Sequence, residues 1–514
     1  MLDETPSVNV VENIALHAKF RGNRIAFICG ERKATWNDFN ASVNVIASAL
    51  KEKGLKKGGK VALLSLNSID AAGVMFGVMR TGGVIVPLSA LLTPPQVASL
   101  VEDSGSQFVF CDAHLQGLIA PVLAQIRIPA QRRIAIGFEG VGWTQLADFL
   151  SGTGTSVPHT QLFDDDEANI MYSSGTTGVP KGIVHDHRAR ALMALVLAAE
   201  LRIDSAAITI LTTPLFSNAT WAILLPTVVM GGTTVMLVRF TPEEFLEAVE
   251  RERASHTLMV PTQIQSVLAS AAMRQRDTTS LRIVVTVGSA MPLPVKEIFL
   301  TTLGDRLVEL YGLTEGVGTM LKPEEVQKKK TSVGTPVSGT EIRVVDDAGH
   351  EVDAGQTGEI VGYSPGLMKR YHNQPKATEE AIWRDEHGRS FLRTGDMGRL
   401  DEDGYLYILD RKKDMIISGG FNVFAVDIEA ILAQHPAVAE ACVIAVPNEK
   451  WGESPLALVV QRHGVAANEE EIREWANARL AKHQRIFAVE FRQEFPRNAV
   501  GKTLKKVLRE SYWK

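Results

Sequence analysis

Residues 172–182 read Tyr-Ser-Ser-Gly-Thr-Thr-Gly-Val-Pro-Lys-Gly, a composition suited to holding phosphate. Hydroxyl groups and glycine amides supply closely spaced donors, and glycine lets the backbone approach phosphate oxygens. Lys181 adds a positive charge for the outer phosphates. The pattern is not a Walker A loop, because Pro180 stands where that loop has glycine directly before lysine. The full segment, placed after the apolar pair Ile170-Met171, favours phosphate binding over an ordinary polar surface loop.

Other short motifs follow this loop in order along the chain. They are Gly288-Ser289-Ala290, Tyr311-Gly312-Leu313-Thr314-Glu315, Thr394-Gly395-Asp396, Asp410-Arg411-Lys412-Lys413-Asp414 and Pro496-Arg497-Asn498-Ala499-Val500-Gly501-Lys502. With segment 172–182 they resemble the motifs of the adenylate-forming (AMP-binding) superfamily, which contains acyl-CoA synthetases, firefly luciferase and peptide-synthetase adenylation domains. The resemblance covers nearly the whole chain, and the acyl-CoA synthetase (fatty-acid–CoA ligase) branch is the one expected.

The resemblance implies two half-reactions, the first being attack of a carboxylate on the α-phosphorus of ATP. It makes Lys502 the main catalytic residue of this step and places Glu315 beside Mg²⁺. Thr176 and Lys181 are expected to act on the phosphates. The remaining loop residues expected to bind ATP are Ser173, Ser174, Gly175, Thr177 and Gly178.

The nucleoside contacts are also implied by the resemblance. Asp396 suits the ribose hydroxyls, and Arg411 is expected at ribose or phosphate. Taken alone, an aspartate in Thr-Gly-Asp is more often a turn residue, but the order of the motifs favours a ligand. The residues expected around adenine and in its motif are Gly288, Ser289, Ala290, Tyr311, Gly312 and Thr314.

The second half-reaction is attack of the coenzyme A thiol on the acyl-adenylate, with AMP as leaving group. Family members reach it by rotating a C-terminal domain, and the hinge position matches Asp410. Gly419 and Gly420 are expected to let the pantetheine arm pass close to the backbone, although this pair alone would suggest an ordinary turn. The expected small molecules are therefore ATP, Mg²⁺, coenzyme A and a carboxylic acid.

The acid pocket of the family lies partly on residues 214–221, and here Ser217 stands where the common pattern has histidine. No aspartate occurs between Leu211 and Leu225, which argues against an amino-acid substrate, and no arginine is present there to pair with a dicarboxylate. A medium- or long-chain fatty acid is the first expectation, and an aryl or arylpropenoic acid the second. The pocket residues expected are Ser217, Trp221, Thr286, Leu313 and Val317.

Three other interpretations remain open at this point. The acceptor could be the pantetheine of a carrier protein, or the chain could be a non-catalytic nucleotide- or acyl-binding protein. Retention of Lys181, Glu315, Asp396 and Lys502 together argues against a silent relative. His185-Asp186-His187 suggests a metal site, but without a further ligand in view a loop after Lys181 is preferred.

The elements that must position these residues alternate between helix and strand. This predicts an α/β fold: a domain at 1–409 with two α/β subdomains and a small β subdomain, then a mobile α+β lid at 410–514, with the active site between them. The expected helices are Ala41–Lys53, Ala71–Arg80, Pro95–Asp103, Asp427–Gln434 and Glu469–Lys482. The expected strands are Val61–Leu64, Val84–Val86, Gln107–Cys111, Ile208–Thr212, Thr234–Leu237, Ile283–Val287, Glu341–Val345, Gly358–Val361 and Val438–Val446.

The composition of the chain limits the partners and the cellular location that can be expected. At 514 residues, with a net charge of −5 and a pI near 6.2, the chain offers no basic field for nucleic acid. Its 3 cysteines are widely spaced, which argues against a disulfide framework. No signal peptide or bilayer-spanning stretch is evident, so a cytoplasmic location is expected, and a homodimer is left open.

Overall fold

The computed structural model describes residues 9–154, 160–173, 180–419, 421–497 and 503–513. The chain forms two compact units. Unit 1 comprises Met1–Lys330, Pro336–Thr340 and Tyr363–Ala381, and unit 2 comprises Thr331–Thr335, Glu341–Gly362 and Ile382–Lys514. The expected division at residue 410, and a lid that moves there, remain predictions.

Unit 1 contains two large sheets with a parallel centre. In spatial order, the strands of the first are β15 (Gly318–Leu321), β14 (Leu307–Gly312), β13 (Ile283–Thr286), β12 (His256–Met259), β10 (Ile208–Leu211), β11 (Thr233–Met236), β1 (Ile25–Cys29) and β2 (Arg32–Thr35). Those of the second are β19 (Arg370–Tyr371), β9 (Lys181–Asp186), β8 (Glu167–Ser173), β4 (Val84–Pro87), β3 (Lys60–Leu64), β5 (Ser106–Asp112), β6 (Arg133–Ile136) and β7 (Thr144–Gln145). The short β16 (Thr335–Pro336) falls where the two units meet in the sequence.

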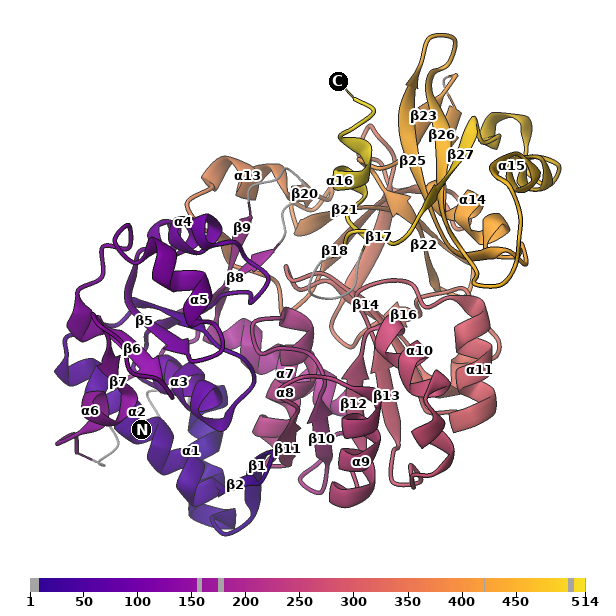
Figure 1. Ribbon diagram of the computed structural model, residues 1–514. Helices are drawn as coiled ribbons and strands as arrows, with labels where there is room; N and C mark the ends of the chain where they lie inside the picture. Colours follow the sequence, from indigo (N-terminus) through magenta and orange to yellow (C-terminus); the bar gives the residue numbers. More distant parts are fainter. Residues whose placement is uncertain (1–8, 155–159, 174–179, 420, 498–502, 514) are drawn as a thin grey trace. The chain divides into compact units, whose positions relative to one another are not determined.

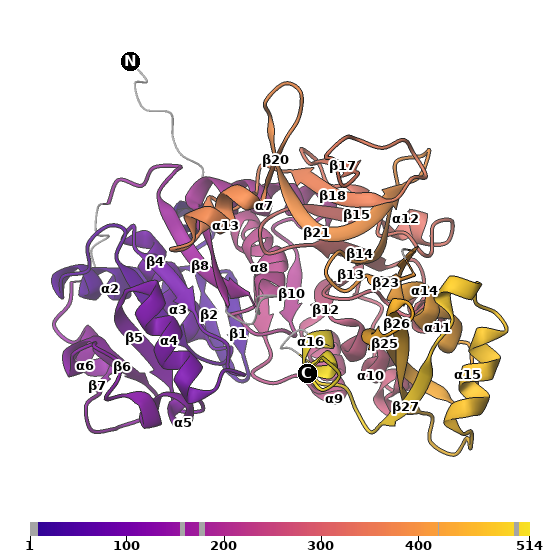
Figure 2. The ribbon, with the colours of Figure 1, turned by 90° about the horizontal axis from the view of Figure 1, so that it is seen from above.

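Helices cover these sheets, as Figures 1 and 2 show for α9 and α10 beside β12 and Figure 2 shows for α3 and α4 beside β5. The helices of unit 1 are α1 (Val10–Arg21), α2 (Trp36–Glu52), α3 (Ile69–Arg80), α4 (Pro94–Ser104), α5 (Gln116–Ile119), α6 (Leu146–Leu150), α7 (His187–Glu200), α8 (Asn218–Met230), α9 (Pro242–Glu252), α10 (Pro261–Ala269), α11 (Leu293–Leu303), α12 (Pro323–Val326) and α13 (Pro375–Glu380).

Alternate residues of β3 enter different cores, which explains why its sequence is continuously apolar. Val61 and Leu63 belong to the large core shared with α2 and α3, whereas Ala62 and Leu64 belong to the core under α4 and α5. A strand buried on both faces needs apolar side chains at successive positions. Two-sided burial therefore confirms the predicted parallel sheet covered by helices.

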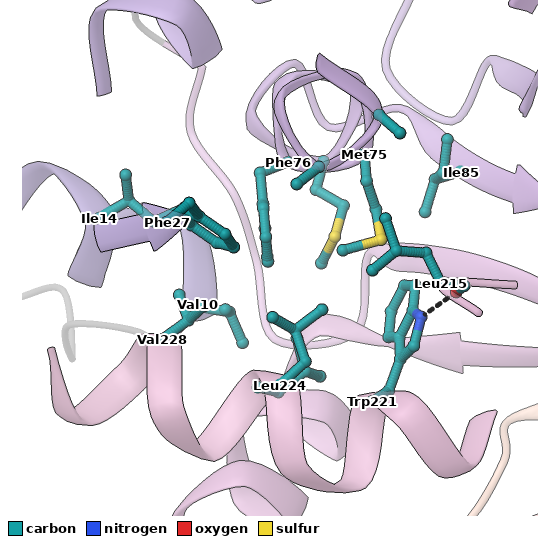
Figure 3. Close-up of a cluster of buried hydrophobic side chains, with 14 of the residues drawn as sticks. Val10, Ile14, Phe27, Met75, Phe76, Ile85, Leu215, Trp221, Leu224 and Val228 are labelled. Atoms are coloured by element: carbon teal, nitrogen blue, oxygen red, sulfur yellow. Dashed lines mark hydrogen bonds between the residues drawn. The ribbon is translucent and has the colours of Figure 1, made fainter. Parts of the chain in front are cut away.

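The large core also joins the two sheets of unit 1 through α8 and α3. Figure 3 shows Trp221, Leu224 and Val228 of α8 facing Met75 and Phe76 of α3. Helix α8 is apolar around its whole circumference, as expected for a helix buried on all sides. Segments with nucleotide and acid motifs are thereby attached to one rigid core.

Unit 2 contains two smaller, mainly antiparallel sheets. The strands of the first, in spatial order, are β17 (Glu341–Val345), β18 (Gly358–Tyr363), β21 (Ser390–Leu400) and β20 (Ile382–Arg384), with β22 (Leu406–Arg411) also on β21. Those of the second are β24 (Phe421–Val423), β23 (Ile416–Ser418), β26 (Gly452–Gln461) and β25 (Val438–Asn448), with β27 (Ala488–Arg492) on β26. The helices of unit 2 are α14 (Ala425–Leu432), α15 (Glu469–Asn477) and α16 (Lys505–Arg509).

Two local expectations were wrong. Residues 185–187 are not a loop: His185 and Asp186 end β9, and His187 begins α7. The Asp186 side chain caps that helix by accepting the Ala189 amide, at 2.8 Å. The expected helix 469–482 stops at Asn477, whose side chain instead bonds the backbone of Ile486.

Candidate active site

The structure describes the two ends of the predicted phosphate segment, residues 172–173 and 180–182. Ser173 closes β8 and pairs with Lys181, the first residue of β9. The Lys181 ammonium lies 4.5 Å from the centre of the Tyr371 ring, a cation–π distance. Ser174, Gly175, Thr176, Thr177 and Gly178 lie outside the described residues.

Glu315 is fixed by a group that sequence reasoning missed. The Tyr371 hydroxyl donates to Glu315 Oε1 at 2.8 Å, and the Met368 amide donates to the Glu315 carbonyl at 2.7 Å. Gly316 follows with a φ of +111°, and a Cβ there would lie 2.2 Å from the Gly366 carbonyl oxygen. Tyr371 therefore links Glu315 to Lys181, although the sequence around it, Lys-Arg-Tyr-His-Asn, carries no signal of that role.

The carboxylate of Glu315 has the chemistry of a magnesium ligand. In the described part of the chain its second oxygen, Oε2, has no hydrogen-bond partner. No cluster of three or more His, Cys, Asp or Glu residues suited to a metal occurs among the described residues. Mg²⁺ ordinarily takes one or two carboxylates together with phosphate oxygens and water, so a single carboxylate fits.

The predicted adenine and acid residues gather at one edge of the first sheet. Residues 287–290 follow β13, residues 313–317 follow β14, and residues 212–217 follow β10. These three strands run parallel, so their carboxyl ends share an edge, the usual ligand side of such sheets. The structure thus brings together motifs that are far apart in sequence.

Exposure differs among these residues. Those predicted near adenine are accessible: Gly288, Ser289, Ala290 and Gly312 are exposed, and Tyr311 and Thr314 are half-buried. Of the predicted acid residues, Leu313 is half-buried, whereas Ser217, Thr286 and Val317 are buried. Their roles remain predictions.

Trp221 is fully buried in the large core. Its indole Nε1 donates to the Leu215 carbonyl at 2.8 Å, the dashed line in Figure 3. The guanidinium of Arg190 lies 4.8 Å from the indole ring centre. Trp221 therefore contributes one face of a buried aromatic–guanidinium stack.

In unit 2 the two predicted ribose residues are neighbours. Asp396 on β21 is opposite Arg411 on β22, and Arg411 Nε lies 2.6 Å from Asp396 Oδ1. The Asp396 amide also donates to Thr394 Oγ1 at 3.1 Å. A turn alone would not need this pairing, which holds a carboxylate and a guanidinium side by side.

The predicted hinge residue Asp410 is half-buried among polar groups of unit 2. Its carboxylate accepts from the amides of Arg411 and Ala425, at 2.7 and 2.9 Å. Burial raises the pKa of Asp410, and the nearby Lys505 opposes that rise. Burial alone would lower the pKa of Lys505, but Glu429 and Asp410 raise it overall, and Glu429 lies 2.9 Å away.

Gly419, the first glycine of the predicted coenzyme A pair, lies in a turn directly after β23. Its φ is +59°, its amide donates to the Trp451 carbonyl at 2.8 Å, and a Cβ would lie 2.8 Å from the Trp451 ring. A side chain at this position would therefore be strained and crowded. Gly420 and Lys502 lie outside the described residues.

The histidines that suggested a metal site are buried in unit 1. Burial, followed by the charge of Arg190, lowers the pKa of His185 well below its usual value. Burial lowers the pKa of His187 to about 4. Both rings are therefore neutral near pH 7.

Comparison with known proteins agrees with these motifs. The "AMP-binding enzyme" family matches residues 14–372, and its "AMP-binding enzyme C-terminal domain" matches residues 427–502. A long-chain-fatty-acid–CoA ligase, FadD13 of Mycobacterium tuberculosis, is 34% identical over 93% of both chains. An indoleacetate–CoA ligase of Aromatoleum aromaticum is 32% identical over 97% of both chains.

Solved structures agree over the whole chain. The ATP-bound MatB of Rhodopseudomonas palustris has a TM-score of 0.89 and 28% identity, with 98% of this chain and 99% of that chain covered. The chain therefore belongs to the AMP-binding enzyme family, within the adenylate-forming superfamily and its acyl-CoA synthetase branch. Membership confirms the predicted fold class and the enzyme class, an AMP-forming acid–thiol ligase.

Proposed function

We propose that this chain activates a carboxylic acid with ATP and transfers the acyl group to coenzyme A. In the first step a carboxylate oxygen bonds to the α-phosphorus of ATP, and the bond to pyrophosphate breaks. In the second, the thiol sulfur bonds to the acyl carbon, the bond to the AMP oxygen breaks, and AMP leaves. Relatives over nearly the full length are named as ligases joining acids to coenzyme A, which supports this proposal.

The observation that carries the proposal is the arrangement of Lys181, Tyr371 and Glu315 in unit 1. A cation and a fixed carboxylate share one tyrosine, beside the segment expected to hold the phosphates. Two anions must meet in the first step, so positive charge at this place offsets their repulsion. Mg²⁺ held by Glu315 would supply further charge neutralisation on the phosphates.

Asp396 and Arg411 are proposed to bind the ribose, and Gly419 and Gly420 to border the pantetheine arm. The buried apolar surroundings of Trp221 support an acid with an apolar body. A medium- or long-chain fatty acid is the first class proposed and an aryl or arylpropenoic acid the second, since a feruloyl-CoA synthase of Amycolatopsis is also 31% identical. Free coenzyme A is preferred to a carrier protein, although a fatty acid–acyl-carrier-protein ligase of Streptomyces coeruleorubidus is 30% identical.

Separating the half-reactions tests the proposal. Lys502→Ala is expected to slow acid-dependent exchange between ATP and pyrophosphate by about 100- to 1,000-fold, the cost of losing one charge-stabilising group. It should leave thioester formation from preformed acyl-adenylate largely intact. Lys506→Ala, at an exposed position of α16, is the matched control. Equal loss of both half-reactions would exclude the role assigned to Lys502.

A further inference from the structure

The guanidinium of Arg190, on α7, is buried, and no carboxylate lies beside it in the described part of the chain. The residue is 1% exposed. Its Nε donates to Asn169 Oδ1 at 2.7 Å, and its Nη1 donates to Asn218 Oδ1 at 2.8 Å. Met193 Sδ lies 3.6 Å from Nη1, and the Trp221 ring completes the surroundings. All of these partners are neutral, so in the described part of the chain the charge is not compensated.

One nitrogen of this side chain is also unbonded. Nη2 is buried and has no hydrogen-bond partner among the described residues. Burial lowers the pKa of Arg190 to about 9, so the group is still a cation near pH 7. A buried charge lacking both a counter-ion and a hydrogen bond is costly. An uncompensated cation with an unbonded nitrogen makes this position suited to an anionic ligand.

Arg80 shows what a purely structural buried arginine looks like in the same unit. It is 6% exposed, and its Nη1 donates to the side-chain oxygens of Asn40 and Asn44. Its Nη2 donates to the Val11 carbonyl at 2.7 Å. Both terminal nitrogens of Arg80 are bonded, whereas Nη2 of Arg190 has no partner among the described residues. Burial of an arginine in this fold does not by itself leave a donor unmet.

Of the residues around the Arg190 guanidinium, Asn218 and Met193 are half-buried and both contact Nη1, whereas Asn169 and Trp221 are fully buried. Turning the Asn218 side chain away would free Nη1 next to the unbonded Nη2. These two nitrogens form the end of the guanidinium that matches both oxygens of a carboxylate. Trp221 and Asn169 hold the guanidinium in place while this happens.

We propose that Arg190 is a specificity-determining residue that binds a second carboxylate of the acid, so that, within the proposed class of fatty acids, those with a carboxylate at each end of the chain are preferred. This rests on the proposed function, because Asn218 and Trp221 belong to the helix that starts at the predicted acid segment. The absence of arginine between Leu211 and Leu225 had argued against a dicarboxylate. The cation comes instead from α7. An apolar body between the two carboxylates keeps the expected contact with the apolar surroundings.

The test compares acids in pairs, each a monocarboxylic acid and the dicarboxylic acid of equal chain length. Acid-dependent pyrophosphate exchange gives kcat/KM for wild type, Arg190→Met and Arg190→Lys. Wild type should prefer the dicarboxylic partner, and Arg190→Met should lower kcat/KM for that partner by about 10- to 100-fold, with a much smaller change for the monocarboxylic acid. Arg190→Lys should restore only part of the loss. Equal loss for both partners would overturn the proposal.

Asn218→Leu provides a second test of the inference, because this variant keeps Arg190 and its bond to Asn169. It fills the approach to the guanidinium, so KM for the dicarboxylic acid should rise by about tenfold more than KM for its partner. An unchanged ratio of the two would contradict the inference. Arg80→Met is the control for burial alone, and it should lower thermal stability without changing the preference between acids.

Binding without turnover separates failure of this inference from failure of the proposed function. The melting temperature is measured with the dicarboxylic acid alone, in the absence of ATP. A rise for wild type, but not for Asn218→Leu, supports the Arg190 site even when no acid is adenylated. Exchange with monocarboxylic acids, without preference or thermal shift for dicarboxylic acids, overturns the inference and leaves the proposed function standing. No exchange with any acid overturns the proposed function.

Discussion

At the scale of single residues, the hydroxyl of Tyr371 defines where the Glu315 carboxylate points. Without this hydroxyl the Glu315 carboxylate could adopt other rotamers, and binding of Mg²⁺ would then include the entropy cost of fixing one of them. Tyr371→Phe is therefore expected to raise the Mg²⁺ concentration needed for half-maximal pyrophosphate exchange and to lower kcat by about 3- to 10-fold, the range for one hydrogen bond.

The measurement is a Mg²⁺ titration of exchange at saturating acid and ATP. Tyr407→Phe is the matched control, because its hydroxyl bonds Asp401 in unit 2, whereas Glu315 belongs to unit 1. An unchanged rate and Mg²⁺ dependence in Tyr371→Phe would contradict the proposed link between the tyrosine and the metal ligand.

The proximity of two residues was predictable where the family motifs assign them to one ligand, and not where contacts between distant segments create it. Asp396 and Arg411 were expected at one ligand from their motifs, and the structure pairs them. Tyr371 and Arg190 were missed because their partners come from other segments. For Arg190 these are Asn169 on β8 and Asn218 on α8. An arginine in an alanine-rich helix gives no sign of burial from sequence alone.

At the scale of elements, an ion pair between α11 and β14 is buried under the edge that carries the motifs. Lys296 and Glu309 are paired there, at 2% and 5% exposure, and Glu309 is opposite Thr286 of β13. Burial raises the pKa of Glu309, and Lys296 opposes that rise. Removing the lysine leaves the carboxylate as an uncompensated buried charge.

Lys296→Met is therefore expected to destabilise the fold by about 3–5 kcal/mol near neutral pH. With the lysine gone, the folded-state pKa of Glu309 rises further above its unfolded value. The folded state then holds the proton more tightly, so stability is retained at low pH and lost as pH rises through the folded pKa. Urea denaturation at pH 5 and pH 8 measures this difference.

The matched control is the double variant Lys296→Met with Glu309→Gln, which removes the charge that the lysine compensated. It should recover most of the stability at pH 8 and show little pH dependence in this range. A loss of the same size at both pH values in the single variant would show that Glu309 is not responsible.

The hydrophobic periodicity of the sequence predicted which helices and strands exist, but it did not predict where they end. The apolar run Val61–Leu64 is strand β3 with one added residue, because burial on both faces leaves a continuous signal. The predicted helix 469–482 was too long, since the bond from Asn477 to the Ile486 backbone competes with the helix. The strand-to-helix junction at Asp186 was missed, because a capping aspartate between two histidines resembled a loop.

At the scale of the whole molecule, the expected contacts with ATP and with coenzyme A are distributed over two compact units. Glu315 and Lys181 belong to unit 1, whereas Asp396, Arg411 and Gly419 belong to unit 2. The sequence predicted that a rotating C-terminal domain serves the two half-reactions in turn, with the hinge at Asp410. That hinge stays a prediction, and the half-reaction test of Lys502→Ala addresses it through kinetics. No helix in the described residues is long and apolar enough to cross a membrane.

The most direct test of acid–CoA ligation is coupled measurement of AMP and thioester, with ATP, Mg²⁺ and coenzyme A. The acids are a panel of fatty, aryl and dicarboxylic acids. We expect AMP release that depends on the acid and matches thioester formation one for one, with dicarboxylic acids preferred over their monocarboxylic partners. AMP release without thioester would point to a carrier-protein acceptor. ATP binding with no AMP release from any acid in the panel would contradict the proposed ligase activity.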